Sequence, residues 1–228
     1  MLPFIYFCNS VPNRRKCNDY MNHMNSDDIG NLKEGLLLVV SGPAGTGKGT
    51  VIKALLKKSI DIVKAPSVTT RKPRKGERNG INYYFKSKEE FIQMAENNEF
   101  IEWVEYCGNF YGTPNRQLKE YLNSGKDVVI EKEVKGAVKI KEEYPNSILI
   151  FLLPPSFHEL KRRIESRGTE DVYAIDKRLE RAKEEIGYIG KYDYVVINDS
   201  VVDASNNIIC IIKAEKLKVC RNINIAKE

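Results

Sequence analysis

The sequence predicts an α/β fold, in which a parallel β-sheet is flanked by helices. Short apolar runs alternate with longer helix-like segments along most of the chain, and a glycine-rich loop joins the first apolar run to the first helix. Strands that alternate with helices imply a parallel sheet with right-handed connections. Between about residues 68 and 118 the pattern becomes rich in strands instead. We therefore expect a core of residues 35–67 and 119–217 that carries an inserted lobe.

The glycine-rich loop has the spacing of a phosphate-binding P-loop: Gly, four residues, Gly and then Lys. It follows the apolar run 36–40 and precedes the helix-like segment 51–58. Its glycines allow backbone N–H groups to point at phosphate oxygens, and its lysine can reach the β- and γ-phosphates of a nucleotide. A plain glycine turn is the alternative. The loop residues are Gly42, Pro43, Ala44, Gly45, Thr46, Gly47, Lys48, Gly49 and Thr50.

One position departs from the usual P-loop. Gly49 stands where a serine or threonine normally follows the lysine, and Thr50 comes next. The direct hydroxyl ligand for Mg²⁺ is therefore absent or shifted to Thr50.

The remaining core elements follow from apolar runs and helix signals. A second strand opens at Ile62 and turns into a loop. Ser156 and Glu159 have the spacing of a capping box at the start of a helix, and residues 167–171 form a polar break. Further strands are expected at 127–131, 147–152 and 194–198, and further helices at 137–144, at 156–166, from the break to about 188, and at 203–217.

Within the lobe, residues 83–85 and 100–106 read as strands, the second because polar and apolar residues alternate. Ser87 and Glu90 form a capping box that opens a helix ending near residue 95. Residues 108–114 are predicted to form a turn that leads into a helix, with Thr113 as the N-cap of that helix and Pro114 at its first position.

Composition and charge narrow the possible functions. The 228 residues carry a net charge of +6, which suits small polyanionic substrates such as nucleotides. There is no basic block with interleaved aromatic residues, so we expect no nucleic-acid partner. The five cysteines are widely spaced without a CxxC, which argues against disulfides and zinc and favours a reducing compartment. No apolar run reaches 18 residues, so no membrane span is expected.

The two ends of the chain read as extensions of the folded domain. Residues 1–34 are rich in Asn, Asp and Ser, and a disordered tail is the simpler interpretation of them. An organelle-targeting segment is not excluded, because Arg14, Arg15 and Lys16 form a basic cluster. Residues 218–228 form a short C-terminal tail. Without a targeting role for residues 1–34, a cytoplasmic location is expected.

A second motif lies at residues 67–74, with the sequence SVTTRKPR. Its two arginines, Arg71 and Arg74, flank a proline that restricts the loop and partly aims both guanidinium groups. Arginine forks match phosphate oxygens with two parallel hydrogen bonds. Taken alone, the segment could also be a solvated basic loop.

Several separated motifs, in this order, resemble the guanylate kinase family. They are SGPAGTGKGT, SVTTRKPRKGE, NGINYYF, EFIEWVEYCGNFYGTP, FLLPPS, ESRGTE and VVINDS. The resemblance runs from about Leu36 to about Glu215. It implies a P-loop nucleoside monophosphate kinase with a GMP-binding lobe at about 68–118 and a mobile helical lid at about 156–185.

The resemblance also implies roles for individual residues. Glu102 matches the carboxylate that selects guanine, although by itself it could be a charge on the exposed face of a strand. Lys48, Arg74, Arg167 and Arg178 match catalytic positions, the last two in the lid. The implied ATP site comprises the loop residues 42–50 with Asn198 and Asp199. The implied GMP site comprises Ser67, Arg71, Arg74, Tyr83, Glu102, Tyr111, Thr113, Glu131 and Glu133.

One stretch departs from the family pattern, in which a strand usually ends in acidic-Ile-Asp-Val-Gln-Gly. Here the sequence is Glu131-Lys132-Glu133-Val134-Lys135-Gly136. Glu133 keeps a carboxylate but is one methylene longer, while two lysines replace an apolar residue and a glutamine. We hypothesise an altered magnesium or GMP contact, although Lys132 could simply point to solvent.

The implied activity is transfer of the ATP γ-phosphate to GMP, with Mg²⁺ brought by ATP. No direct protein ligand for the metal is certain, and Thr50 and Glu133 are the candidates. ATP and GMP are the expected partners, and no obligate protein partner is evident. Two other functions stay open: a guanylate-kinase-like protein-interaction module with weak or no catalysis, and a kinase for another nucleotide.

Overall fold

The computed structural model describes residues 34–106, 108–165 and 172–222. Contacts divide the chain into two units. One unit holds residues 34–212, and the other includes the described residues 213–222. In the second unit a short helix, α9 (Val219–Asn222), follows the end of α8, and the Asn222 amide donates to the carbonyl oxygens of Lys216 and Lys218.

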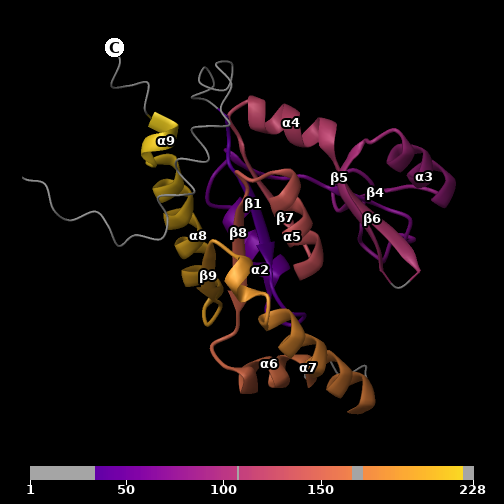
Figure 1. Ribbon diagram of the computed structural model, residues 1–228. Helices are drawn as coiled ribbons and strands as arrows, with labels where there is room; N and C mark the ends of the chain where they lie inside the picture. The colour runs from indigo at the N-terminus through magenta and orange to yellow at the C-terminus, as the bar shows by residue number, and fades with distance from the viewer. Residues whose placement is uncertain (1–33, 107, 166–171, 223–228) are drawn as a thin grey trace, which may run out of the picture. The chain divides into compact units, whose positions relative to one another are not determined.

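A parallel five-stranded sheet forms the centre of the first unit (Figure 1). The strand order is β2-β7-β1-β8-β9, and every neighbouring pair is parallel. The predicted parallel sheet is therefore confirmed. The strands are β1 (Leu37–Ser41), β2 (Ile62–Lys64), β7 (Asp127–Glu131), β8 (Ile148–Leu153) and β9 (Tyr194–Ile197).

Seven longer helices accompany the two sheets of this unit within the described residues. Their bounds are α2 (Lys48–Leu56), α3 (Lys88–Glu96), α4 (Asn115–Asn123), α5 (Val134–Glu143), α6 (Phe157–Glu165), α7 (Val172–Ile186) and α8 (Val201–Lys216). A 3₁₀ turn, η2 (Ile189–Lys191), leads into β9. None of the helices that the structure describes is long and apolar enough to cross a lipid bilayer.

The central strand β1 is buried on both faces, because helices cover both sides of the sheet. Leu38 and Val40 pack with residues of α2 and α8, such as Val51 and Ile208. Leu37 and its neighbour Val39 pack with residues of α4 and α5 on the opposite face. Successive side chains of a strand point to opposite faces, so a run of apolar residues without alternation is what a doubly covered strand requires.

A second, four-stranded sheet forms the lobe, with the order β4-β3-β6-β5. Its strands are β3 (Ser67–Thr69), β4 (Tyr83–Phe85), β5 (Phe100–Tyr106) and β6 (Asn109–Pro114). The prediction of a turn at 108–114 was wrong, because Asn109–Pro114 pairs antiparallel with both β5 and β3. Thr113 therefore lies in a strand, and α4 begins at Asn115 with Pro114 as its N-cap.

Aromatic rings hold helix α3 against this second sheet. Phe91 stacks on Phe100 and Phe110 with ring centroids 4.6 and 5.4 Å apart. Gly112 lies beneath this stack, since a Cβ atom there would come within 2.7 Å of the Phe100 ring. The predicted capping box is confirmed: Ser87 accepts from the Glu90 amide, and the Glu90 carboxylate accepts from the Ser87 amide.

The helices α6 and α7 pack side by side through their own small apolar cluster (Figure 1). Leu160 and Ile164 of α6 meet Leu179 and Ala182 of α7. Ser156 caps α6, because its hydroxyl accepts from the Glu159 amide at 3.1 Å. Arg167, which was predicted to be catalytic, lies outside the described residues.

Candidate functional site

The P-loop connects β1 to α2 and adopts backbone conformations that only glycine accepts readily. Gly42 has φ +137°, and a Cβ atom there would come within 2.3 Å of the Leu152 carbonyl oxygen. Gly47 has φ +87°, and a Cβ atom there would come within 2.6 Å of the Asn198 amide nitrogen. Other parts of the chain thus approach the loop closely at both positions, which accounts for the glycines there.

The Lys48 side chain folds back over this loop and is nearly buried. Its Nζ atom donates to the carbonyl oxygens of Gly42 at 2.6 Å and Pro43 at 3.2 Å. The Thr46 hydroxyl donates to the same Pro43 oxygen at 2.9 Å. The ammonium group therefore sits at the loop itself.

Asn198 fixes the other side of the loop. It is buried, and its Nδ2 atom donates to the Thr46 carbonyl oxygen at 2.7 Å. The backbone carbonyl oxygen of Asn198 accepts from the Arg163 guanidinium at 3.1 Å, and Arg163 in turn pairs with Glu159. Hydrogen bonds from Arg162 and Arg163 lower the pKa of Glu159 to about 2. Asp199 follows as an exposed residue next to the loop.

The carboxylate of Glu131 lies beside the start of α2. A Cβ atom at Gly49 would be 3.6 Å from a Glu131 oxygen, so the glycine leaves room for this acidic side chain. Carboxylate oxygens are ligands that Mg²⁺ accepts, usually in combination with substrate phosphates and water. Thr50 is exposed in the first turn of α2. No group of three or more potential metal ligands occurs among the described residues.

Glu102 lies in β5 with its carboxylate almost completely buried. Its Oε1 atom accepts from the Thr113 hydroxyl at 3.0 Å and lies 2.5 Å from the Lys132 ammonium nitrogen. Its Oε2 atom is buried without a hydrogen-bond partner in the part of the chain that the structure describes. The interpretation of Glu102 as a charge on an exposed strand face is therefore wrong.

Lys132 is also buried, with 8% of its side chain exposed, so the interpretation that it points to solvent is wrong. Its Nζ atom lies 3.5 Å from the Ser67 hydroxyl as well as beside Glu102. The structure thus brings together Ser67, Glu102 and Thr113, which the sequence predicted as neighbours, and adds Lys132 to them.

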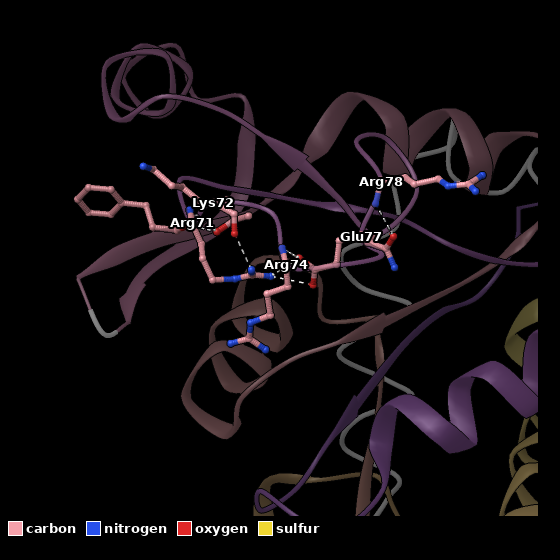
Figure 2. Close-up of polar contacts among 8 residues, drawn as sticks. Arg71, Lys72, Arg74, Glu77 and Arg78 are labelled. Atoms are coloured by element: carbon pink, nitrogen blue, oxygen red, sulfur yellow. Dashed lines mark hydrogen bonds and ion pairs between the residues drawn. The ribbon is translucent and has the colours of Figure 1, made fainter. Parts of the chain in front are cut away.

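Arg71 is held in place by Glu77. Its Nη2 atom lies 2.9 and 3.0 Å from the two Glu77 oxygens, as Figure 2 shows. Burial lowers the pKa of Arg71, but the ion pair with Glu77 and the nearby Tyr111 outweigh this and raise it. The guanidinium also lies over the Tyr83 ring, 5.5 Å from its centroid. This geometry is more ordered than a solvated basic loop would be.

Arg74 extends from the same loop and is exposed (Figure 2). Its backbone amide donates to Glu77 Oε2 at 2.7 Å, and the Arg74 amide is the main cause that lowers the Glu77 pKa, with Arg71 adding to it. Tyr83 and Tyr111 approach edge to face with centroids 6.2 Å apart. Glu77 therefore orders the segment that carries both predicted phosphate-binding arginines.

Two further predicted residues lie at or near the helix α7. Arg178 is half-buried in that helix. Glu133 is exposed and lies 3.6 Å from the Arg181 guanidinium. Arg181 also pairs with Glu185 of its own helix and lies over the Tyr106 ring of β5. One arginine thus contacts α7, β5 and the residue that precedes α5.

Comparison with known proteins identifies the family. A model of the guanylate kinase family matches residues 34–215 of the chain.

The chain belongs to the guanylate kinase family.

The sequence of this chain is similar to those of known guanylate kinases over most of their length. A guanylate kinase of Halalkalibacterium halodurans is 53% identical over 82% of this chain and 91% of its own length. One of Clostridioides difficile is 51% identical over 86% of this chain and 96% of its own. The crystal structure of guanylate kinase from Anaplasma phagocytophilum is 37% identical, covers 83% of this chain and 90% of its own, and has a TM-score of 0.68. The predicted family and fold are therefore confirmed.

Sequence reasoning about this guanylate kinase missed three residues that organise its site. They are Glu77, Arg163 and Arg181. Lys132 was singled out in the sequence because it replaces an apolar residue of the family pattern, but its partners Glu102 and Ser67 were not predicted. Glu77 lies three residues after Arg74, a spacing that suits a turn, but nothing in the sequence shows that its carboxylate faces Arg71.

Proposed function

We propose that this guanylate kinase transfers the γ-phosphate of ATP to GMP and releases ADP and GDP. The observation that carries the proposal is the buried carboxylate of Glu102, whose Oε2 atom lacks a partner within the described ranges. A buried carboxylate oxygen without a donor is costly, which is a reason to expect a ligand that supplies one.

Guanine is the nucleobase that fits this carboxylate. Its N1–H and 2-amino groups both donate, so they can bind the carboxylate together. Adenine presents an acceptor at N1 and lacks the 2-amino group, and it would leave Glu102 without these donors. Sites built to hydrogen-bond a substrate group reject an analogue that lacks it by roughly 10⁴-fold or more. Thr113 keeps Glu102 in place, and Ser67 adds a hydroxyl to the pocket.

The phosphate of GMP would be bound by Arg71 and Arg74 with the hydroxyls of Tyr83 and Tyr111. Glu77 supports this proposal, because it holds Arg71 and the backbone of Arg74 in one arrangement. A phosphate monoester has a second pKa of about 6, so the acceptor is largely a dianion at neutral pH. The reaction therefore needs no general base, and the barrier lies in bringing two polyanions into line.

The P-loop amides and Lys48 would bind the β- and γ-phosphates of ATP, with Asn198 and Asp199 near the adenine. Mg²⁺ supplied with ATP would neutralise phosphate charge, and Glu131, with Thr50 and Glu133 as further candidates, offers oxygen ligands near the loop. Positioning and electrostatic stabilisation account for most of the rate enhancement in phosphoryl transfer. Lys48 and Arg74 supply positive charge on the two sides of the transferring group.

We further propose that residues of about 156–185 form a lid whose arginines, Arg167 and Arg178, complete the positive charge around the phosphates. Closure would exclude water, which otherwise hydrolyses ATP.

The free thiols of Cys210 and Cys220 are consistent with an enzyme that acts in the reducing cytosol. An interaction module that has lost catalysis is disfavoured, because Lys48, Arg71, Arg74 and Arg178 are all present.

The test is product formation in a mixture of MgATP and GMP, followed by chromatography of all four nucleotides. We expect ADP and GDP to appear in equal amounts, and Lys48→Ala to abolish both. ADP without GDP would indicate hydrolysis and contradict the proposal. Failure to bind ATP at all would favour the interaction module.

A further inference from the structure

Lys132 is an unusual residue for the place it occupies. It follows the last residue of β7, and its backbone amide donates to the Val40 carbonyl oxygen of β1 at 3.1 Å, so it continues the core sheet. Its side chain then reaches the lobe, where Nζ lies 2.5 Å from Glu102 Oε1 and 3.5 Å from Ser67 Oγ. The family pattern has an apolar side chain at this position.

Stability alone does not explain this buried ion pair. Withdrawing two charges from water costs about as much as their attraction returns, and apolar residues of similar size are often as good or better. An ammonium group beside the carboxylate that we assign to guanine therefore calls for an explanation in ligand binding. Glu102 Oε2 and the Lys132 stem both lie against Gly136, at 3.5 and 3.9 Å from where a Cβ atom would lie, so the glycine leaves room for both side chains.

The donors and acceptors in the pocket match the edge of guanine when Lys132 is included. A carboxylate offers about four lone-pair positions, and Thr113 and Lys132 occupy two of them on Oε1. Oε2 remains for the N1–H and 2-amino donors of guanine. An ammonium group has three donors, and Lys132 directs two of them to Glu102 and Ser67. One donor remains, and the one acceptor of guanine next to N1 is O6.

We propose that Lys132 is a specificity-determining residue that donates to O6 of guanine while it stays paired with Glu102. This inference rests on the function proposed above, because it assigns GMP to the same pocket. It also adds to the rejection of adenine, whose 6-amino group would place a donor against the ammonium group. The pocket thus reads all three polar groups of the guanine edge with two oppositely charged side chains.

The experiment measures binding by calorimetry and uses 6-thioguanosine monophosphate, in which a weakly accepting sulfur replaces O6. The variants are Lys132→Met and Lys132→Ile, and isoleucine is the residue of the family pattern. Both remove the ammonium group, so the test can proceed if only one of the two variants folds. Lys139→Met, at an exposed position of α5, is the matched control. Wild type and control should bind GMP roughly 10- to 100-fold more tightly than the thio analogue, the range expected for a hydrogen bond to a charged group.

Removing the ammonium group should weaken GMP binding by a similar factor and reduce the preference for GMP over the analogue to less than about threefold. Unchanged or tighter GMP binding by both variants would overturn the inference. So would an equal loss for both ligands, which would mean that Lys132 acts only through Glu102. A wild type that binds GMP without forming GDP would contradict the proposed function while this comparison still decides the role of Lys132. A wild type that binds no GMP would overturn both.

Discussion

Replacing Glu102 with glutamine changes a single heavy atom of the pocket. Among single substitutions in the pocket, it should weaken the preference of the pocket for guanine most. The substitution keeps the shape of the side chain but converts one acceptor oxygen into an amide donor. The Thr113 hydroxyl and Lys132 can still bind the remaining oxygen, as they now bind Oε1. The amide nitrogen then occupies the position of Oε2, the atom that we assign to guanine, and faces the guanine N–H groups with a donor.

The magnitude follows from the bonds that are lost. A hydrogen bond to a charged group contributes about 1.5–3 kcal/mol, and guanine would lose two of them. The loss of about 3–6 kcal/mol corresponds to a fall in kcat/KM for GMP of roughly 10²- to 10⁴-fold. KM for ATP should not change, because the P-loop lies on separate elements of the core. Steady-state kinetics with varied GMP and saturating MgATP measure the effect.

Glu105→Gln is the matched control, because it makes the same chemical change at an exposed position of the same strand. It should leave kcat/KM unchanged. Thermal unfolding of each protein separates a binding defect from misfolding, since Glu102→Gln leaves Lys132 as a buried charge without its counter-ion. A folded Glu102→Gln protein with wild-type kcat/KM for GMP would refute the assignment of Glu102 to guanine.

Three further predictions concern other parts of the site and the core. Glu77→Gln should raise KM for GMP several-fold, because Arg71 loses its two-oxygen partner. Since the Glu77 pKa is lowered from 4.5, its contribution to stability is present above pH 4.5 and lost as the pH falls through the folded-state value; urea unfolding should show wild type and variant converging in acid. Arg178→Ala should lower kcat far more than it raises KM for GMP, and the opposite pattern would mean that Arg178 only binds the ground state. Asp127→Ala should destabilise the fold by about 1–3 kcal/mol in urea titration, because the buried Leu36 amide loses its acceptor at 3.0 Å; an unchanged midpoint would contradict this.

The core could be predicted from sequence because its signals are local. Residues 127–131 form a strand with the predicted bounds, and the P-loop occurs between the predicted strand and helix. Both faces of β1 are covered by helices, so its side chains are apolar on both faces. A continuous apolar run, without alternating polar residues, is therefore enough to predict this strand. The capping box at Ser87 likewise depends only on residues three positions apart.

The errors lie where distant residues decide the structure. Asn109–Pro114 contains Gly, Asn and Pro, which are typical of turns, yet it is a strand because β3 and β5 lie on either side of it. Lys132 is buried because Glu102 and Ser67 meet it from the other sheet, which no local pattern reveals. Glu77 and Arg163 were missed for the same reason, since their partners are fixed by the fold of a loop or by contacts across elements.

The most direct test of the account is the ratio of kcat/KM for GMP to that for AMP in the wild-type protein. The assay follows ADP formation from MgATP, with dGMP and UMP as further acceptors. A buried carboxylate and an ammonium group that together match the guanine edge predict a ratio on the order of 10⁴ or more. A ratio near one, or faster turnover with AMP, would contradict the assignment of the Glu102 pocket to guanine.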